Sequence, residues 1–154
     1  MPPLNLPAFE VRVAQRSGKP VIFDFIRRTY VALTPEEWVR QHFVHYLVGQ
    51  KRFPAGLMAN EVTAAYNGIK RRCDTVLYRR NLTPFMIVEY KAPSVRITQA
   101  VFEQITRYNM VLHVDYLVVS NGLQHYCCRI DYKENRYTFL EDIPMYEEMG
   151  APPV

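Results

Sequence analysis

An acidic and a basic side chain stand two residues apart at the end of an apolar segment, in the sequence Val88-Glu89-Tyr90-Lys91. The segment 85–88 is typical of a buried strand, in which successive side chains alternate between the two faces. Glu89 and Lys91 therefore share one face. This pattern predicts a strand that begins in the core and ends in charged groups at the rim of the fold.

A second carboxylate can reach the same point from the preceding strand. Asp74 stands fifteen residues before Glu89 (89 − 74 = 15), inside a segment with strand character at 70–78. If a turn at 79–83 joins two neighbouring strands, both carboxylates point to one place and repel each other unless a cation lies between them. A hard ion such as Mg²⁺, with Mn²⁺ as a substitute, takes carboxylate, carbonyl and water oxygens and leaves room for a phosphate.

These groups suit the hydrolysis of a phosphodiester. Lys91, on the same face as Glu89, can orient or deprotonate a metal-bound water and neutralise the charge that develops on the phosphate. The alternative is structural, because a Glu-x-Lys pair on a strand is often an exposed ion pair that contributes less than ~1 kcal/mol. In that case the acids and Lys91 form a charge cluster without catalysis.

The spacing Asp-x14-Glu-x-Lys, after an apolar strand and before a helix, resembles the PD-(D/E)XK nuclease superfamily. Residues from about 33 to 130 are similar to the N-terminal nuclease domain of type I restriction enzyme R subunits. The resemblance implies that Asp74, Glu89 and the backbone carbonyl of Tyr90 bind metal and that Lys91 is catalytic. The matching segments are 34–40, 72–74, 87–93, 104–108 and 120–122.

A helix expected at 97–112 carries a Gln-x-x-x-Tyr element, Gln104 and Tyr108, which follows the core in many members of this superfamily. The resemblance implies that these two residues position DNA near the metal, and we expect Arg72 and Arg107 to contact the nucleic acid beside them. Gln104 and Tyr108 lie on the apolar stripe of the helix, which predicts that their side chains point toward the sheet. The alternative for Gln104 is a structural amide. The stripe comprises Ile97, Val101, Ile105 and Leu112.

Two glutamates open the first helix, which begins after Thr34 as N-cap. Glu37 stands three residues after Thr34 and completes a capping box, which explains it structurally. Glu36 falls on the core-facing stripe with Phe43, so we favour Glu36 as a further catalytic or metal-binding acid. Glu61 is a weaker acid candidate and is expected to be a surface strand residue.

The order of elements predicts an α/β sandwich-like fold, in which helices flank a mixed sheet with a restriction-endonuclease-like core. We expect one domain over 1–154, with an N-terminal hairpin at about 8–31, the core at about 33–130 and a tyrosine-rich C-terminal edge at 131–154. The expected strands are 9–13, 21–25, 61–66, 70–78, 85–91, 114–120 and 123–130, and the expected helices are 34–49 and 97–112.

Composition fits this picture. A chain of 154 residues, 49% hydrophobic, with a net charge of +4, can bury one core and mildly favours an anionic partner. Its three cysteines suggest a reducing compartment, and the sequence shows neither a signal peptide nor an apolar stretch long enough to span a membrane. We expect a soluble, cytoplasmic protein.

The function predicted from the sequence is a Mg²⁺-dependent nuclease of restriction type that acts on DNA. No helicase motif is present, so the protein acts alone, as a homodimer, or as a cleavage module for a separate restriction or helicase partner. One alternative is a catalytically silent module that binds nucleic acid or protein on the same fold. Another is a small interaction domain whose tyrosine-rich edge pairs with a partner strand.

Overall fold

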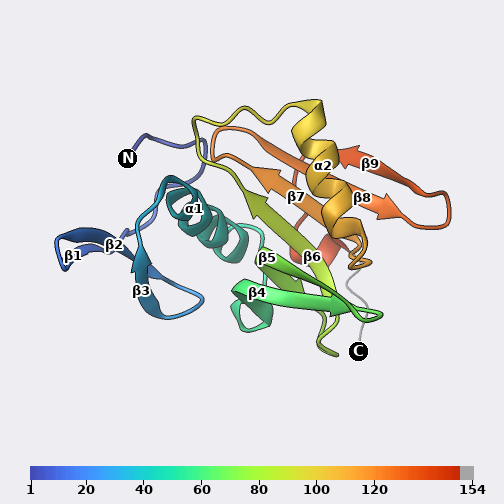
Figure 1. The fold of residues 1–154 in the computed structure, drawn as a ribbon, viewed down its shortest axis with the longest axis horizontal. Helices are drawn as coiled ribbons and strands as arrows, with labels where there is room; N and C mark the ends of the chain where they lie inside the picture. Colours follow the sequence, from blue (N-terminus) through green and yellow to red (C-terminus); the bar gives the residue numbers. More distant parts are fainter. Residues whose placement is uncertain (150–154) are drawn as a thin grey trace.

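The computed structural model describes residues 1–149, which form two sheets and two α-helices (Figure 1). The small sheet contains β1 (Val13–Arg16), β2 (Lys19–Asp24) and β3 (Thr29–Ala32). The large sheet contains β4 (Met58–Tyr66), β5 (Ile69–Tyr78), β6 (Pro84–Tyr90), β7 (Tyr116–Ser120), β8 (His125–Asp131) and β9 (Arg136–Leu140). The helices are α1 (Pro35–Gly49) and α2 (Gln99–Met110), with 3-10 turns η1 (Ala55–Leu57) and η2 (Tyr146–Met149).

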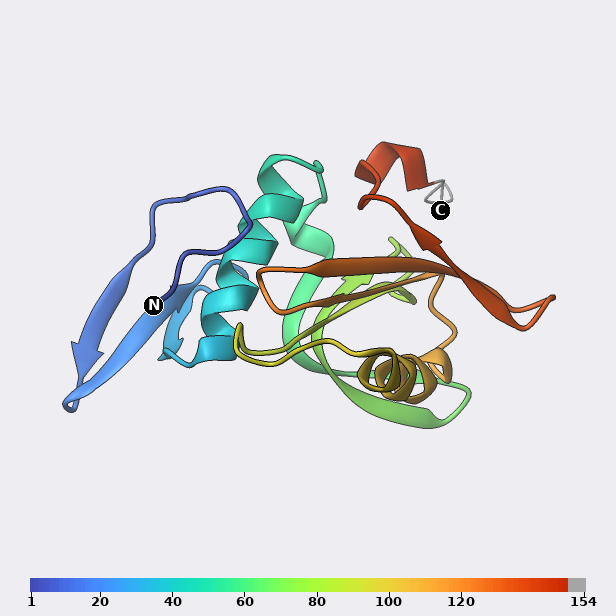
Figure 2. The same cartoon turned by 90° about the horizontal axis from the view of Figure 1, so that it is seen from above.

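The large sheet is mixed and is covered on both faces. Its strands follow the chain order from β4 to β9, and β6 and β7 are parallel because α2 provides the crossover between them. Met86 and Val88 pack against α1 and η2, whereas Ile87 packs on the side of α2 (Figure 2). This arrangement confirms the predicted α/β fold with a mixed sheet between helices.

The N-terminal sheet contains the predicted hairpin and one additional strand. Ser17 and Gly18 form its turn with positive φ angles of 51° and 75°, as a two-residue hairpin loop requires. The first strand begins at Val13, so the boundary predicted at 9–13 is wrong. The third strand, β3, was missed because its four residues lack a turn signal on either side.

Helix α2 buries a different stripe from the predicted one. Phe102 is 3% exposed and contacts three aromatic rings of β8 and β9, whereas Tyr108 is 48% exposed and Gln104 is also exposed. Burying a phenylalanine side chain stabilises a fold by about 1.5–3 kcal/mol, so Phe102 sets the rotation of the helix. The prediction that Gln104 and Tyr108 point toward the sheet is therefore wrong.

The C-terminal region holds more regular structure than the sequence indicated. Strand β9 pairs with β8 along the edge of the sheet, and Met149 of η2 is buried against the core. Residues 150–154 of the predicted C-terminal edge lie outside the described residues. Within residues 1–149, no helix is long and apolar enough to span a bilayer.

A buried polar contact joins the two sheets. The Asn60 side-chain amide donates to both carboxylate oxygens of Asp24 at 3.1 Å, and the Asn60 oxygen accepts a hydrogen bond from the Thr75 hydroxyl at 2.7 Å. Burial alone would raise the pKa of Asp24, but hydrogen bonds from the backbone and side chain of Arg27 and from Asn60 outweigh it and hold that pKa below its usual value. Asn60 thus fixes the N-terminal sheet against the large one.

We predict that Asn60→Ala lowers the free energy of unfolding by about 2–3 kcal/mol, because it removes the Asn60 hydrogen bonds to the buried Asp24 carboxylate and leaves the buried Thr75 hydroxyl without its acceptor. Thr63→Ala, at an exposed position of the same strand, is the matched control and should change it by less than about 0.5 kcal/mol. Urea denaturation of both variants measures the difference. Equal losses in the two variants would show that the contact does not join the sheets.

Candidate active site

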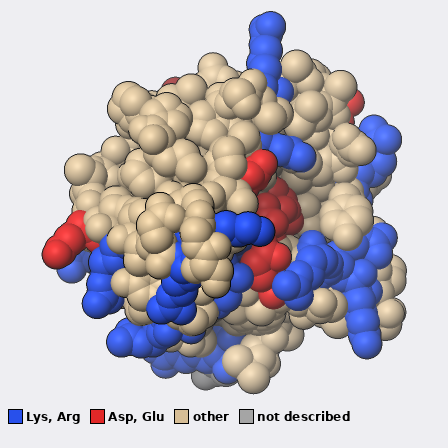
Figure 3. Space-filling view, turned by 60° about the vertical axis from the view of Figure 1, so that its left-hand side comes forward, with Lys and Arg blue, Asp and Glu red and all other residues tan. Residues whose placement is uncertain are grey.

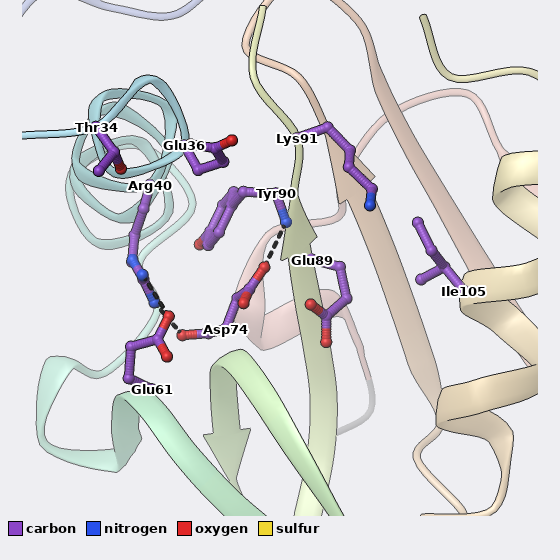
Figure 4. A pocket seen from close by; sticks show the side chains of 9 residues that line it. All are labelled: Thr34, Glu36, Arg40, Glu61, Asp74, Glu89, Tyr90, Lys91 and Ile105. Atoms are coloured by element: carbon purple, nitrogen blue, oxygen red, sulfur yellow. Dashed lines mark hydrogen bonds and ion pairs between the residues drawn. The ribbon is translucent and has the colours of Figure 1, made fainter. Parts of the chain in front are cut away.

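Asp74, in the middle of β5, and Glu89, near the end of β6, come together on neighbouring strands. The two strands are antiparallel with Thr75 opposite Val88, and the next step of the same register places Asp74 opposite Glu89. One carboxylate oxygen of Asp74, Oδ2, accepts a hydrogen bond from the Tyr90 N–H at 2.9 Å. Figure 4 shows both acidic side chains on the same cavity. The structure therefore places the two carboxylates where the strand pattern predicted.

Glu89 is held in an unfavourable state for a carboxylate. Its Oε1 is buried and has no hydrogen-bond partner in residues 1–149. Burial, followed by the neighbouring charge of Asp74, raises the pKa of Glu89 from its ordinary value of 4.5 to about 9. A proton or a bound cation must compensate the charge of this pair at neutral pH.

Lys91 supplies a free ammonium group next to the carboxylates. Its backbone N–H donates to the Ser120 carbonyl at 2.9 Å, which fixes the end of β6 against β7. The side chain points into the space between β6 and α2 (Figure 4). In the described part of the chain, its ammonium makes no ion pair with a carboxylate. Lys91 is therefore available to a bound anion.

Two adjoining cavities surround these residues. The first has a volume of about 410 Å³ and is lined by Thr34, Glu36, Arg40, Glu61, Asp74, Glu89, Tyr90, Lys91 and Ile105. The second, of about 290 Å³, is lined by Arg72, Glu89, Lys91, Val95, Val101, Gln104, Ile105, Tyr108 and Asn109. Figure 3 shows acidic side chains in a hollow with basic side chains around it. Glu89 and Lys91 belong to both cavities and connect them.

Three of the four residues predicted to contact nucleic acid line the second cavity. Gln104, Tyr108 and Arg72 line the second cavity, and all three do so from exposed positions, the first two on α2 and Arg72 on β5. Arg107 is exposed and lines neither cavity. The structure thus brings the Gln-x-x-x-Tyr element to the rim of the site by a different face of the helix from the one expected.

Glu36 and Glu37 exchange their predicted environments. Glu36 is exposed and lines the first cavity, so its predicted place on the core-facing stripe is wrong. Glu37 is buried, and its carboxylate accepts hydrogen bonds from Arg27, Arg40 and Gln41 at 2.9–3.1 Å. The Thr34 hydroxyl accepts a hydrogen bond from the Glu37 N–H and caps the helix as predicted. The Glu37 carboxylate does not complete the predicted capping box, because it binds Arg27, Arg40 and Gln41 instead.

Arg40 was missed by sequence reasoning. It is 6% exposed and donates to Glu37, to Glu61 at 2.6 Å and to the backbone carbonyl of Asp74 at 2.6 Å. Its only local signal is the i, i+3 pair with Glu37, which does not reveal partners on β4 and β5. Arg40 therefore ties the helix to the strand that carries Asp74.

Glu61 is part of the site rather than a surface strand residue. It lines the first cavity and pairs with Arg40 and, at 3.4 Å, with Arg72. Its φ angle is +54°, an unusual backbone conformation for a non-glycine residue inside a strand. Such a distortion costs on the order of 1–3 kcal/mol and is often found at functional sites. Here it directs the Glu61 carboxylate toward Arg40.

The donor groups fit a hard divalent ion. Within residues 1–149, no three side chains of His, Cys, Asp or Glu lie close enough to form a complete site. Two carboxylates and the backbone carbonyl of Tyr90 are oxygen ligands of the kind that Mg²⁺ prefers, and this ion keeps its other positions for water and phosphate. The buried oxygen of Glu89 without a partner is the observation that supports this fit.

Comparisons with known proteins match the part of the chain that contains Asp74, Glu89 and Lys91. A family model described as "Type I restriction enzyme R protein N terminus (HSDR_N)" matches residues 35–144. A solved fragment of a candidate HsdR subunit of a type I restriction enzyme from Vibrio vulnificus YJ016 is similar, with 21% sequence identity and a TM-score of 0.41. That similarity covers 60% of this chain and 19% of the other. No curated protein matches the sequence.

We predict that Glu89→Gln changes how stability depends on pH. Because the pKa of Glu89 is raised in the fold, the folded protein holds one more proton than the unfolded chain between pH 4.5 and about 9. The contribution of Glu89 to stability is therefore greatest below pH 4.5 and falls as the pH rises through this window. At pH 8 without divalent ions, the variant should be more stable than the original protein by at least about 1 kcal/mol, or about 2–4 °C in Tm.

Thermal denaturation at pH 5 and pH 8 measures this difference, with Glu134→Gln, at an exposed position, as the control. The advantage of Glu89→Gln should grow between the two pH values, whereas the control should follow the original protein. Parallel pH profiles for all three proteins would contradict a raised pKa at Glu89.

Proposed function

This chain belongs to the family of type I restriction enzyme R protein N termini (HSDR_N), and on that basis we propose that it is a metal-dependent nuclease that hydrolyses DNA phosphodiester bonds. One observation carries the proposal. Glu89, with a buried oxygen that has no partner, lines the same cavity as Asp74 and as Lys91, whose ammonium forms no ion pair within residues 1–149. A structural charge cluster would instead pair its acids with its lysine.

Asp74, Glu89 and the carbonyl of Tyr90 would hold Mg²⁺, with Mn²⁺ as a substitute. When bound, such an ion polarises the phosphate and lowers the pKa of a coordinated water. Lewis-acid chemistry of this kind needs a site closed to bulk solvent on one side. Ile87, two residues before Glu89 on the same face of β6 and fully buried, provides that closed side.

Lys91 acts on the reacting groups. In this proposal its Nζ donates hydrogen bonds to a non-bridging oxygen of the scissile phosphate and orients the attacking water. The charge that develops on the phosphate then lies next to a cation that no carboxylate of the described chain neutralises. Lys91 would therefore stabilise the transition state more than the ground state.

Residues of the second cavity would position the DNA strand. Gln104 and Tyr108 project from α2 at its rim, and Arg72 extends there from β5. Their amide, phenol and guanidinium groups suit phosphate, sugar and base contacts. Arg107 is exposed outside both cavities and would contact only more distant parts of the DNA. Glu36, on the opposite wall of the first cavity, would act through water rather than as a direct ligand.

The protein would work within a restriction system. The family match concerns the N terminus of R proteins, and the chain spans about 19% of the similar solved chain. It would therefore act alone, as a homodimer, or as a cleavage module for a separate restriction or helicase partner. The competing function is a silent module that binds nucleic acid or protein on the same fold.

Metal uptake and cleavage should be separable by mutation. We expect Glu89→Ala and Asp74→Ala to lose Mn²⁺ binding in isothermal titration together with cleavage of plasmid and linear DNA. Lys91→Ala should bind Mn²⁺ normally but cleave roughly 10²–10³-fold more slowly, because it removes one transition-state contact. Glu134→Ala, an exposed acid in the β8–β9 turn, is the control and should retain both activities.

Two results would count against the nuclease. Absence of metal uptake, even with DNA present, would favour the silent binding module. Cleavage that survives in Asp74→Ala and Lys91→Ala would assign the activity to other residues.

A further inference from the structure

One face of the N-terminal sheet carries exposed basic side chains, Arg12, Arg16 and Lys19, beside two half-buried aromatic rings, Phe23 and Tyr30. Phe23 lies opposite Tyr30 in β3, and its N–H donates to the carbonyl of Arg12, directly before β1. Arg16 lies opposite Lys19 in the same hairpin. Opposed residues of antiparallel strands share a face, so these five side chains form one surface, which we call the outer face. The inner face holds Ile22 and Asp24, both fully buried.

Aromatic rings hold the arginines of the outer face in place. The guanidinium of Arg12 lies 4.6 Å from the ring centroid of Phe23, and that of Arg16 lies 4.6 Å from the centroid of Tyr30. The two rings contact each other edge to face at 5.4 Å. A stacked guanidinium keeps its N–H donors free at the edge, where they match the oxygens of a phosphate. Both arginines are thus oriented before any ligand binds.

The positive charge of the chain is concentrated in this region. Residues 1–33 contain five Lys or Arg and two Asp or Glu, a net charge of +3, whereas the remaining residues carry +1 of the total +4. Asp24 lies on the inner face, bound by Arg27 and Asn60, and the strand positions of the outer face contain no acid. This surface is complementary to a polyanion.

The outer face ends at the rim of the candidate active site. Ala32 is the last residue of β3, and Thr34, two residues later, lines the first cavity. Two residues span at most about 7 Å. Arg27, in the turn between β2 and β3, binds Glu37 at 3.0 Å and thereby fixes the sheet beside the start of α1. Figure 1 shows the three-stranded sheet next to α1. A strand that leaves the cavity at this rim meets the outer face.

We propose that the outer face binds the phosphate backbone of DNA as a grip without sequence preference, next to the site of cleavage. The location relative to the cavity rests on the nuclease function proposed above, but binding itself can be measured without cleavage. The family model begins at residue 35, so this sheet lies outside the matched region. The grip is accordingly an addition to the part of the chain that the family shares.

The test compares Arg12→Gln/Arg16→Gln with Lys133→Gln/Arg136→Gln. The second pair removes the same charge from exposed positions at the β8–β9 turn, which lies at the other end of the molecule (Figure 1). The probe is a fluorescent duplex of about 30 base pairs in EDTA, titrated between about 50 and 200 mM KCl. The outer-face variant should bind about tenfold more weakly, and its slope of log K against log [KCl] should decrease by about 2. The control should match the original protein.

Two further measurements separate the possible outcomes. Arg12→Lys/Arg16→Lys keeps the charge, so its salt slope should remain while its affinity falls, which excludes unfolding as the cause. Hydrolysis of bis(p-nitrophenyl) phosphate with Mn²⁺, a diester too small to reach the outer face, should be unchanged in all variants. If the original protein does not hydrolyse this diester, the result contradicts the proposed nuclease function but not DNA binding by the outer face.

The proposal is overturned if Arg12→Gln/Arg16→Gln binds the duplex with the affinity and salt slope of the original protein, or if the original protein does not bind the duplex. It is also overturned if Arg12→Gln/Arg16→Gln changes the oligomeric state measured by sedimentation but leaves DNA binding unchanged. The outer face would then be a contact between two copies of the chain.

Discussion

The guanidinium of Arg40 connects three parts of the chain at the point where the candidate site forms. It is buried, and it joins Glu37 of α1, Glu61 of β4 and the backbone carbonyl of Asp74 in β5. Removing one partner of a buried ion pair costs about 3–5 kcal/mol, because the other charge remains buried and unpaired. Since Arg27 also binds Glu37, the same network extends to the N-terminal sheet. The position of Asp74 depends on these contacts.

The acids around the site fall into two groups. Asp24, Glu37 and Glu61 are each neutralised by an arginine. In the described part of the chain, Asp74 and Glu89 form no ion pair, although they face each other across neighbouring strands. Among the acids that line the first cavity, Glu61 is thus paired with an arginine, whereas Asp74, Glu89 and the exposed Glu36 form no ion pair within residues 1–149. This difference, rather than the number of carboxylates, distinguishes a metal site from a structural cluster.

Some of this could be predicted from sequence because it depends on local periodicity. The alternation along β5 and β6 placed Asp74, Glu89 and Lys91 together, and the capping residue Thr34 fixed the start of α1. What failed depends on contacts between distant segments. The rotation of α2 is set by rings of β8 and β9 around Phe102, and the burial of Glu37 results from a sheet that covers α1. No helical spacing contains that information.

The most direct test of the central claim is an anomalous diffraction map from crystals of the protein soaked in Mn²⁺. If Asp74 and Glu89 are left unpaired for an ion, the map should show a single strong peak within about 2.0–2.3 Å of both carboxylates and of the Tyr90 carbonyl. A peak elsewhere, or a hydrogen-bonded carboxyl pair without a peak at saturating Mn²⁺, would contradict the account.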